Sequence, residues 1–111
     1  MSEDTSGEPA TSVFVHRPGD AWEAAAELAV AAVLVVSLHP AGGYRWSPIV
    51  SSDGAVAEVF GTVGDDGAAR FRVLGKSAGS AVLSATTEHL GDRFGPPTRR
   101  WVLRLRVLGE E

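Results

Sequence analysis

The clearest pattern in the sequence is an alternation of apolar and polar positions over three segments of its second half. Ala69–Val73, Ser80–Thr86 and Trp101–Leu108 place apolar side chains at every second position. A period of two is typical of a strand that buries one face. Turn-forming residues fill the intervals, as at Gly64–Gly67 and Gly75–Gly79. Short strands separated by such turns predict an all-β sandwich or barrel.

The first half of the chain is less regular. Residues 1–10 are polar and acidic, which predicts a disordered tail before a single domain over residues 11–109. Thr11–Val15 is rich in strand-forming residues, and the valine-rich Ala29–Leu38 predicts a buried strand. Trp22–Glu27 contains helix formers, so a helix and a strand both remain open for it.

Composition and charge narrow the class of protein. The 111 residues carry a formal net charge of −4, which gives no reason to expect a nucleic acid or an anionic membrane as partner. The longest apolar run, Leu28–Val36, has about half the length that a bilayer requires. The first residues lack the features of a secretory signal, so we expect a cytoplasmic protein.

Candidate catalytic chemistry is sparse. The sequence has no cysteine, which excludes disulfides and thiolate sites. His16, His39 and His89 do not have the spacing of a metal or hydrolase motif. Asp65 and Asp66 lack the alternating oxygen ligands of a calcium loop. We therefore expect no enzyme, no cofactor and no bound metal.

The most unusual segment is His39–Pro48, which holds two prolines, adjacent glycines and two aromatics between apolar runs. Proline and glycine predict an exposed loop, and exposed aromatics often serve recognition. Tyr44 is either an anchor for a partner or a side chain that packs on the sheet edge. Trp46 and Trp101 are expected in the core, while Trp22 could cover an open end of the sandwich.

The order of these features resembles that of the chagasin-like inhibitors of papain-type cysteine proteases. The first family loop reads N-P-T-T-G followed by Tyr or Phe, and the matching segment here is His39–Tyr44, with Trp46 behind it. The second is a glycine-rich turn, matched by Val63–Gly67. The third carries R-P-W, and the equivalent stretch, Thr87–Leu90, has none of these residues.

The resemblance implies an immunoglobulin-like antiparallel β-sandwich that covers a protease cleft reversibly with three loops at one end. The implied partner-binding residues are His39, Pro40, Ala41, Gly42, Gly43 and Tyr44 of the first loop, Gly64, Asp65, Asp66 and Gly67 of the second, and His89 and Leu90 of the third. Tyr44 would supply apolar area, and Gly42 and Gly43 would permit close backbone approach.

A second function stays open beside inhibition. Ala41 and Gly42 stand where the family has two threonines, and Asp66-Gly67 is also the dipeptide expected of an ordinary hairpin turn. The alternative is a diverged sandwich that acts as an interaction or assembly partner of another cytoplasmic protein without inhibiting a protease.

Overall fold

The computed structural model describes residues 11–89 and 99–109, and the regular elements of these residues are all β-strands. The predicted tail, residues 1–10, lies outside them. In chain order the strands are β1 (Thr11–His16), β2 (Glu23–Ala29), β3 (Val33–Leu38), β4 (Tyr44–Trp46), β5 (Val50–Ser51), β6 (Ala57–Val63), β7 (Ala69–Gly75), β8 (Gly79–His89) and β9 (Arg100–Leu108). Within the described residues, no helix is long and apolar enough to cross a membrane.

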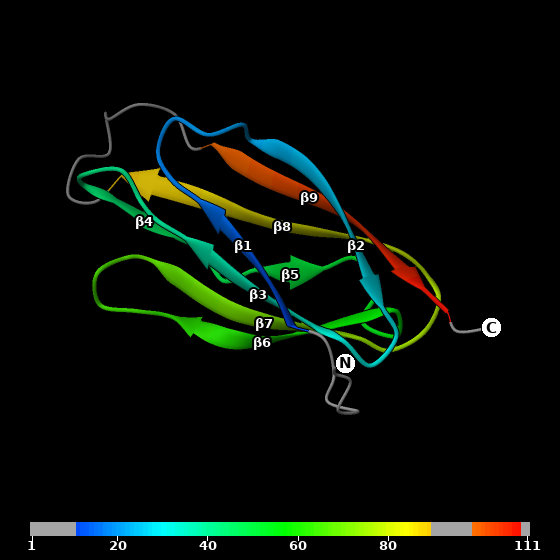
Figure 1. Ribbon diagram of the computed structural model, residues 1–111. Coiled ribbons are helices and arrows are strands. Elements are labelled where there is room, and N and C mark those ends of the chain that lie inside the picture. Colours follow the sequence, from blue (N-terminus) through cyan, green and yellow to red (C-terminus); the bar gives the residue numbers. More distant parts are fainter. Residues whose placement is uncertain (1–10, 90–98, 110–111) are drawn as a thin grey trace, which may run out of the picture.

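The strands form two sheets that face each other (Figure 1). One has the order β1-β3-β7-β6; the other has the order β2-β9-β8-β4, with β5 also paired to β8. The all-β sandwich is thus confirmed. The sheets are mixed rather than purely antiparallel, because β1 pairs parallel to β3 and β2 pairs parallel to β9. The chain reaches β3 from β1 by way of β2 in the opposite sheet, and such a crossover allows a parallel pair.

The core lies between the two sheets and follows from the period-two pattern. In β7 and β9 buried and exposed residues alternate, so each strand turns its apolar side inward. Leu83 and Leu103 are 0% exposed, as is Trp101, and Trp46 is 2% exposed. The expected burial of both tryptophans is confirmed. Removal of this apolar area from water is the main stabilising contribution.

The region from Trp22 to Leu38 differs from its sequence pattern. Glu23–Ala29 forms a strand although alanine and glutamate favour helices, because its backbone pairs with β9 from Val102 to Leu108. The single strand predicted over Ala29–Leu38 is wrong, because Ala29 ends β2 and the three residues that follow it are not in a strand. Ala31 has a φ of 73°, and the Ala32 N–H donates to the Ala29 carbonyl at 3.0 Å, so a tight turn precedes β3.

Four strand-to-strand connections leave the sandwich at the same end. β1, β3, β6 and β8 finish there, and β2, β4, β7 and β9 begin there (Figure 1). We call this the loop end; in the described residues it carries the connections 17–22, 39–43 and 64–68. The first two of the three loops suggested by the sequence therefore lie at one end of the molecule.

Candidate binding site at the loop end

The first loop is shaped by a turn over Ala41–Tyr44. The Tyr44 N–H donates to the Ala41 carbonyl with a nitrogen-to-oxygen distance of 3.0 Å. Gly43, the third residue of this turn, has a φ of 80°. Side chains with a Cβ rarely adopt such a φ, and type II turns place glycine at this position.

The second loop is the hairpin between β6 and β7. The Gly67 N–H donates to the Gly64 carbonyl at 2.9 Å, and the Ala68 N–H donates to Asp66 Oδ1 at 3.0 Å. Arg70 Nη2 lies 2.9 Å from Asp66 Oδ2, and this hydrogen-bonded guanidinium lowers the pKa of Asp66. Asp66 thus has a structural role in the hairpin, whereas Asp65 is exposed.

Gly67 brings the two loops together. Its carbonyl accepts a hydrogen bond from the Trp46 N–H at 2.9 Å. A Cβ at Gly67 would lie 2.9 Å from the Tyr44 carbonyl oxygen and 3.3 Å from the Arg45 Cα, so the backbones touch where only glycine fits. The first loop and the β6–β7 hairpin are therefore in contact at Gly67.

The third loop is the part of the site that the sequence placed incorrectly. Thr87–His89 belongs to β8 and pairs with β4, in the register Tyr44 with His89 and Trp46 with Thr87. The connection to β9 starts after His89, and Leu90 lies outside the described residues. Polar Thr-Glu-His gave no strand signal of its own. Its strand conformation depends on β4, a partner some 40 positions earlier in the chain.

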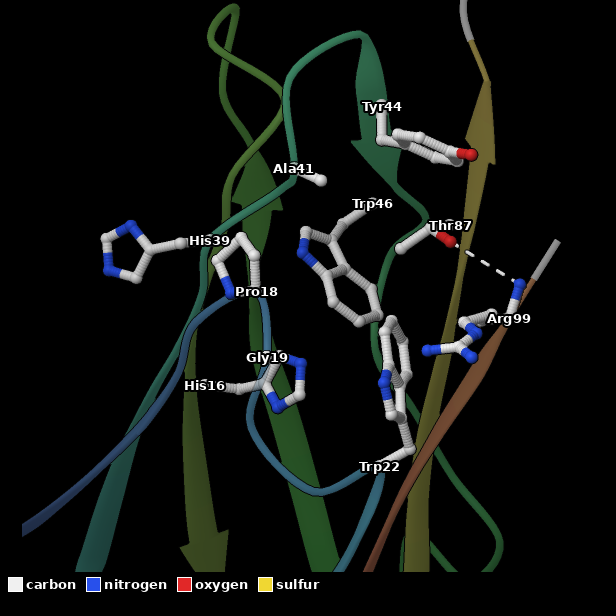
Figure 2. A pocket seen from close by; sticks show the side chains of 10 residues that line it. All are labelled: His16, Pro18, Gly19, Trp22, His39, Ala41, Tyr44, Trp46, Thr87 and Arg99. Carbon is white, nitrogen blue, oxygen red and sulfur yellow. Dashed lines mark hydrogen bonds between the residues drawn. The ribbon is translucent and has the colours of Figure 1, made fainter. Parts of the chain in front are cut away.

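A cavity of about 400 Å³ lies beside the first loop (Figure 2). No pattern in the sequence indicated it, because its walls come from four separate segments of the chain. We call it the loop-end pocket, and it is lined by His16, Pro18, Gly19, Trp22, His39, Ala41, Tyr44, Trp46, Thr87 and Arg99. Figure 2 shows the ring of His39 turned away from the two indoles.

Three rings form one wall of the loop-end pocket. The centroid of the His16 ring lies 4.9 Å from that of Trp22 and 5.6 Å from that of Trp46, with both contacts edge to face. The two indoles are themselves 5.6 Å apart. Trp22 is half-buried and stands at the open end of the sandwich, as its position in the sequence suggested. Its backbone carbonyl extends the ladder to β9 by accepting from the Val102 N–H at 2.9 Å.

His16 is 1% exposed, and neither ring nitrogen has a hydrogen-bond partner among the described residues. Burial lowers the pKa of His16 from its usual 6.5. The negative charge of Asp20 raises the pKa of His16, and so does the nearby backbone of Ala21. The Ala21 contact does not have the geometry of a hydrogen bond. An unpaired buried polar group costs about 1–3 kcal/mol and often marks a functional position.

The described part of the chain offers little to a metal ion. No cluster of three or more His, Asp or Glu side chains lies close enough together to hold one in residues 11–89 and 99–109. The groups that the described loop end presents are backbone, aromatic and cationic.

No protein-family model matches the sequence, and no curated protein matches it. Several solved structures do have a similar fold. The cysteine protease inhibitor EhICP2 of Entamoeba histolytica superposes with a TM-score of 0.64 over 93% of this chain and 100% of its own, at 10% identity. Amebosin superposes with a TM-score of 0.52 over 91% of this chain and 100% of its own, at 14% identity.

This chain has the fold of the chagasin-like cysteine protease inhibitors. The resemblance noted in the sequence, and the immunoglobulin-like sandwich that it implied, are confirmed. A third solved structure, PbICP-C in complex with falcipain-2, matches at a TM-score of 0.48 and 13% identity over 96% of each chain. At these identities the similarity concerns the fold.

Proposed function

We propose that this protein is a reversible inhibitor of papain-type cysteine proteases and has no enzymatic activity of its own. It would cover the active-site cleft with the loop end and offer no peptide bond in register for cleavage. The observation that carries the proposal is the contact between the first loop and the β6–β7 hairpin. The Trp46 N–H to Gly67 carbonyl bond holds both loops at one end of a sandwich whose fold is that of EhICP2, a cysteine protease inhibitor.

The geometry of the first loop supports an occluding role. Ala41, Gly42 and Gly43 are exposed, and Gly42 has no heavy atom within 4 Å of where a Cβ would stand. A turn of small residues can approach another protein's backbone closely. The Trp46 bond restrains the loop before binding, which reduces the entropy lost on association.

The sequence that follows His89 also bears on inhibition, although residues 90–98 lie outside the described residues. The sequence between β8 and β9 includes Arg93 and Phe94. An arginine and an aromatic are the residue types that the family's R-P-W loop supplies, and such residues dominate many interfaces. We therefore expect Phe94→Ala to weaken protease binding.

The test is inhibition of papain, followed by hydrolysis of a fluorogenic peptide as the protein is added. Wild type should inhibit at micromolar concentration or below, and activity should return on dilution. Tyr44→Ala should weaken inhibition by about tenfold or more if Tyr44 is an anchor at the centre of the interface. Gly43→Ala should also weaken it, because the turn would lose its positive φ.

Gly54→Ala is the matched control. Gly54 lies in the turn before β6, at the end of the sandwich away from the loop end, and its Cβ would meet nothing within 4 Å. This variant should inhibit like wild type. Absence of inhibition by folded wild-type protein at micromolar concentration would overturn the proposal.

The alternative is an interaction or assembly partner of another protein that does not inhibit proteases. The observation in its favour is Ala41 and Gly42 in place of the family's two threonines, because the exposed turn then presents no side-chain hydroxyl. Capture of the same partner from a lysate by wild type and Gly54→Ala, but not by Tyr44→Ala, without inhibition of papain, would favour this function.

A further inference from the structure

The loop-end pocket has walls suited to a flat apolar group. Trp22 and Trp46 form one side with His16, and Pro18 and Ala41 contribute further apolar surface (Figure 2). The volume of about 400 Å³ is within the range of small-molecule sites in proteins. Aromatic walls favour a planar ligand, because offset and edge-to-face contacts between rings add to the gain from apolar burial.

Two buried side chains of the loop-end pocket, His16 and Trp46, carry polar atoms without partners among the described residues. The Trp46 Nε1–H, which can only donate, has no acceptor among the described residues, and Trp46 is 2% exposed. Both ring nitrogens of the 1% exposed His16 are also unpaired, and one of them donates in the neutral imidazole. Because each of these nitrogens has less than 1 Å² of exposed surface, a ligand in the cavity would meet the faces and edges of the rings rather than the nitrogens.

Arg99 adds a positive charge at the edge of the same pocket. Its guanidinium carbon lies 5.2 Å from the centroid of the Trp22 ring. Among the described residues, Arg99 forms no salt bridge. Asp20, whose negative charge is felt at His16, does not line the pocket, and its carboxylate accepts from the Arg17 N–H at 2.8 Å. The charge at the pocket therefore favours an anion.

We propose that the loop-end pocket is a binding site for a small aromatic carboxylate. The ring of the ligand would lie against Trp22 and Trp46. The carboxylate would lie beside the Arg99 guanidinium, at the edge of the pocket. This inference does not depend on protease inhibition, since it concerns a cavity beside the first loop rather than the exposed turn.

The test is a titration of the ¹⁵N-labelled protein followed by NMR, with phenylacetate, phenylacetamide and acetate as probes. Phenylacetate should bind saturably and shift the indole N–H signals of Trp22 and Trp46. The signal of Trp101 should stay in place, since Trp101 packs on Phe14 outside this pocket. Phenylacetamide has the same ring without the charge and should bind about tenfold more weakly. Acetate alone should bind too weakly to saturate.

Variants at exposed arginines distinguish recognition from loss of folding. Arg99→Gln should weaken phenylacetate about tenfold and leave phenylacetamide unchanged, because it removes the charge from an exposed side chain. Arg106→Gln, an equally exposed arginine of β9 outside the pocket, should change neither affinity. Trp46→Phe should weaken phenylacetate, while Trp101→Phe, which also removes an unpaired buried indole N–H, should not.

Three results would overturn the inference. The first is a phenylacetate titration that fails to saturate at millimolar concentration. The second is equal affinity for phenylacetate and phenylacetamide, because the carboxylate would then not be recognised. The third is unchanged affinity in folded Arg99→Gln, which would leave the pocket a general apolar cavity.

Discussion

His16 ends β1 with its ring between the indoles of Trp22 and Trp46, at 4.9 and 5.6 Å between centroids. Its place in the strand explains its burial, because Phe14 and His16 share the inward side of β1. Burial among apolar rings lowers the pKa of this imidazole and so disfavours its protonated form. His16 therefore links the stability of the loop end to pH.

We predict that His16 makes the protein less stable as the pH falls below 6.5. Burial lowers the pKa of His16 in the folded chain from 6.5, so the unfolded chain binds more protons between the two values. Unfolding is then favoured as the pH decreases, until the folded-state pKa is passed. The measurement is the free energy of unfolding in urea, from pH 8 to pH 5.

His16→Gln is the comparison that isolates this contribution. Asp20, His39, Tyr44 and Arg99, which are titratable groups of the loop end, remain in the variant and in wild type. The unfolding free energy of wild type minus that of His16→Gln should decrease as the pH falls. Parallel curves over the whole range would contradict the prediction.

At the scale of elements, β4 and the β6–β7 hairpin form one unit. β4 has only three residues and pairs with β8 on one side, while the N–H of its last residue, Trp46, donates to the carbonyl of Gly67 in the turn that joins β6 and β7 of the opposite sheet. So short a strand gains little from its own ladder. Contacts from both sheets hold it in place, and the first loop depends on all of them.

We predict that Gly67→Ala destabilises the protein and displaces the first loop. The new Cβ would meet the Tyr44 carbonyl oxygen at 2.9 Å, and the φ of 83° disfavours alanine. Strain of this kind costs about 1–3 kcal/mol. Urea unfolding should register the loss, and the amide signals of Tyr44 and Trp46 should shift in NMR spectra.

Gly54→Ala serves again as the control, because its Cβ would meet nothing within 4 Å. A glycine-to-alanine change without strain stabilises a chain slightly, through the unfolded state. The same small effect in Gly67→Ala, with unmoved signals of Tyr44 and Trp46, would show that the two loops are not coupled.

At the scale of the whole molecule, the sandwich depends on pairings between distant segments. β9 lies between β2 and β8 and joins the beginning and the end of the chain in one sheet. Leu103, near the middle of β9, is 0% exposed and faces the other sheet. A defect there should weaken both layers together.

We predict that Leu103→Ala lowers the free energy of unfolding by about 2–5 kcal/mol, because it removes buried methyl groups and leaves a cavity. Unfolding should remain a single cooperative transition, as for most domains of this size. Val13→Ala is the matched control: Val13 is 68% exposed on β1, so its loss should stay within about 0.5 kcal/mol. Equal losses in the two variants would contradict the arrangement of the core.

The sequence alone was sufficient for the strands with a clear period of two. The sequence predicts β7, β8 and β9 because each turns one face to the core and the other to solvent. This arrangement is visible locally as an alternation of apolar and polar residues. The burial of Trp46 and Trp101 and the positive φ of Gly43 follow from the same short-range rules. The family resemblance identified the fold and brought the first and second loops to one end.

The tertiary structure decided what depends on distant partners. Glu23–Ala29 is a strand because its backbone pairs with β9, and Thr87–His89 is a strand because its backbone pairs with β4. A turn at Ala31 interrupts the strand that the sequence predicted over Ala29–Leu38. This turn is held by a contact with a distant residue, because the Ala31 N–H donates to the Gly75 carbonyl at 2.8 Å. The loop-end pocket has no signal in the sequence. His16, Trp22 and Trp46 meet only after two sheets have formed, because hydrophobic periodicity records which side of a strand is buried and not what it is buried against.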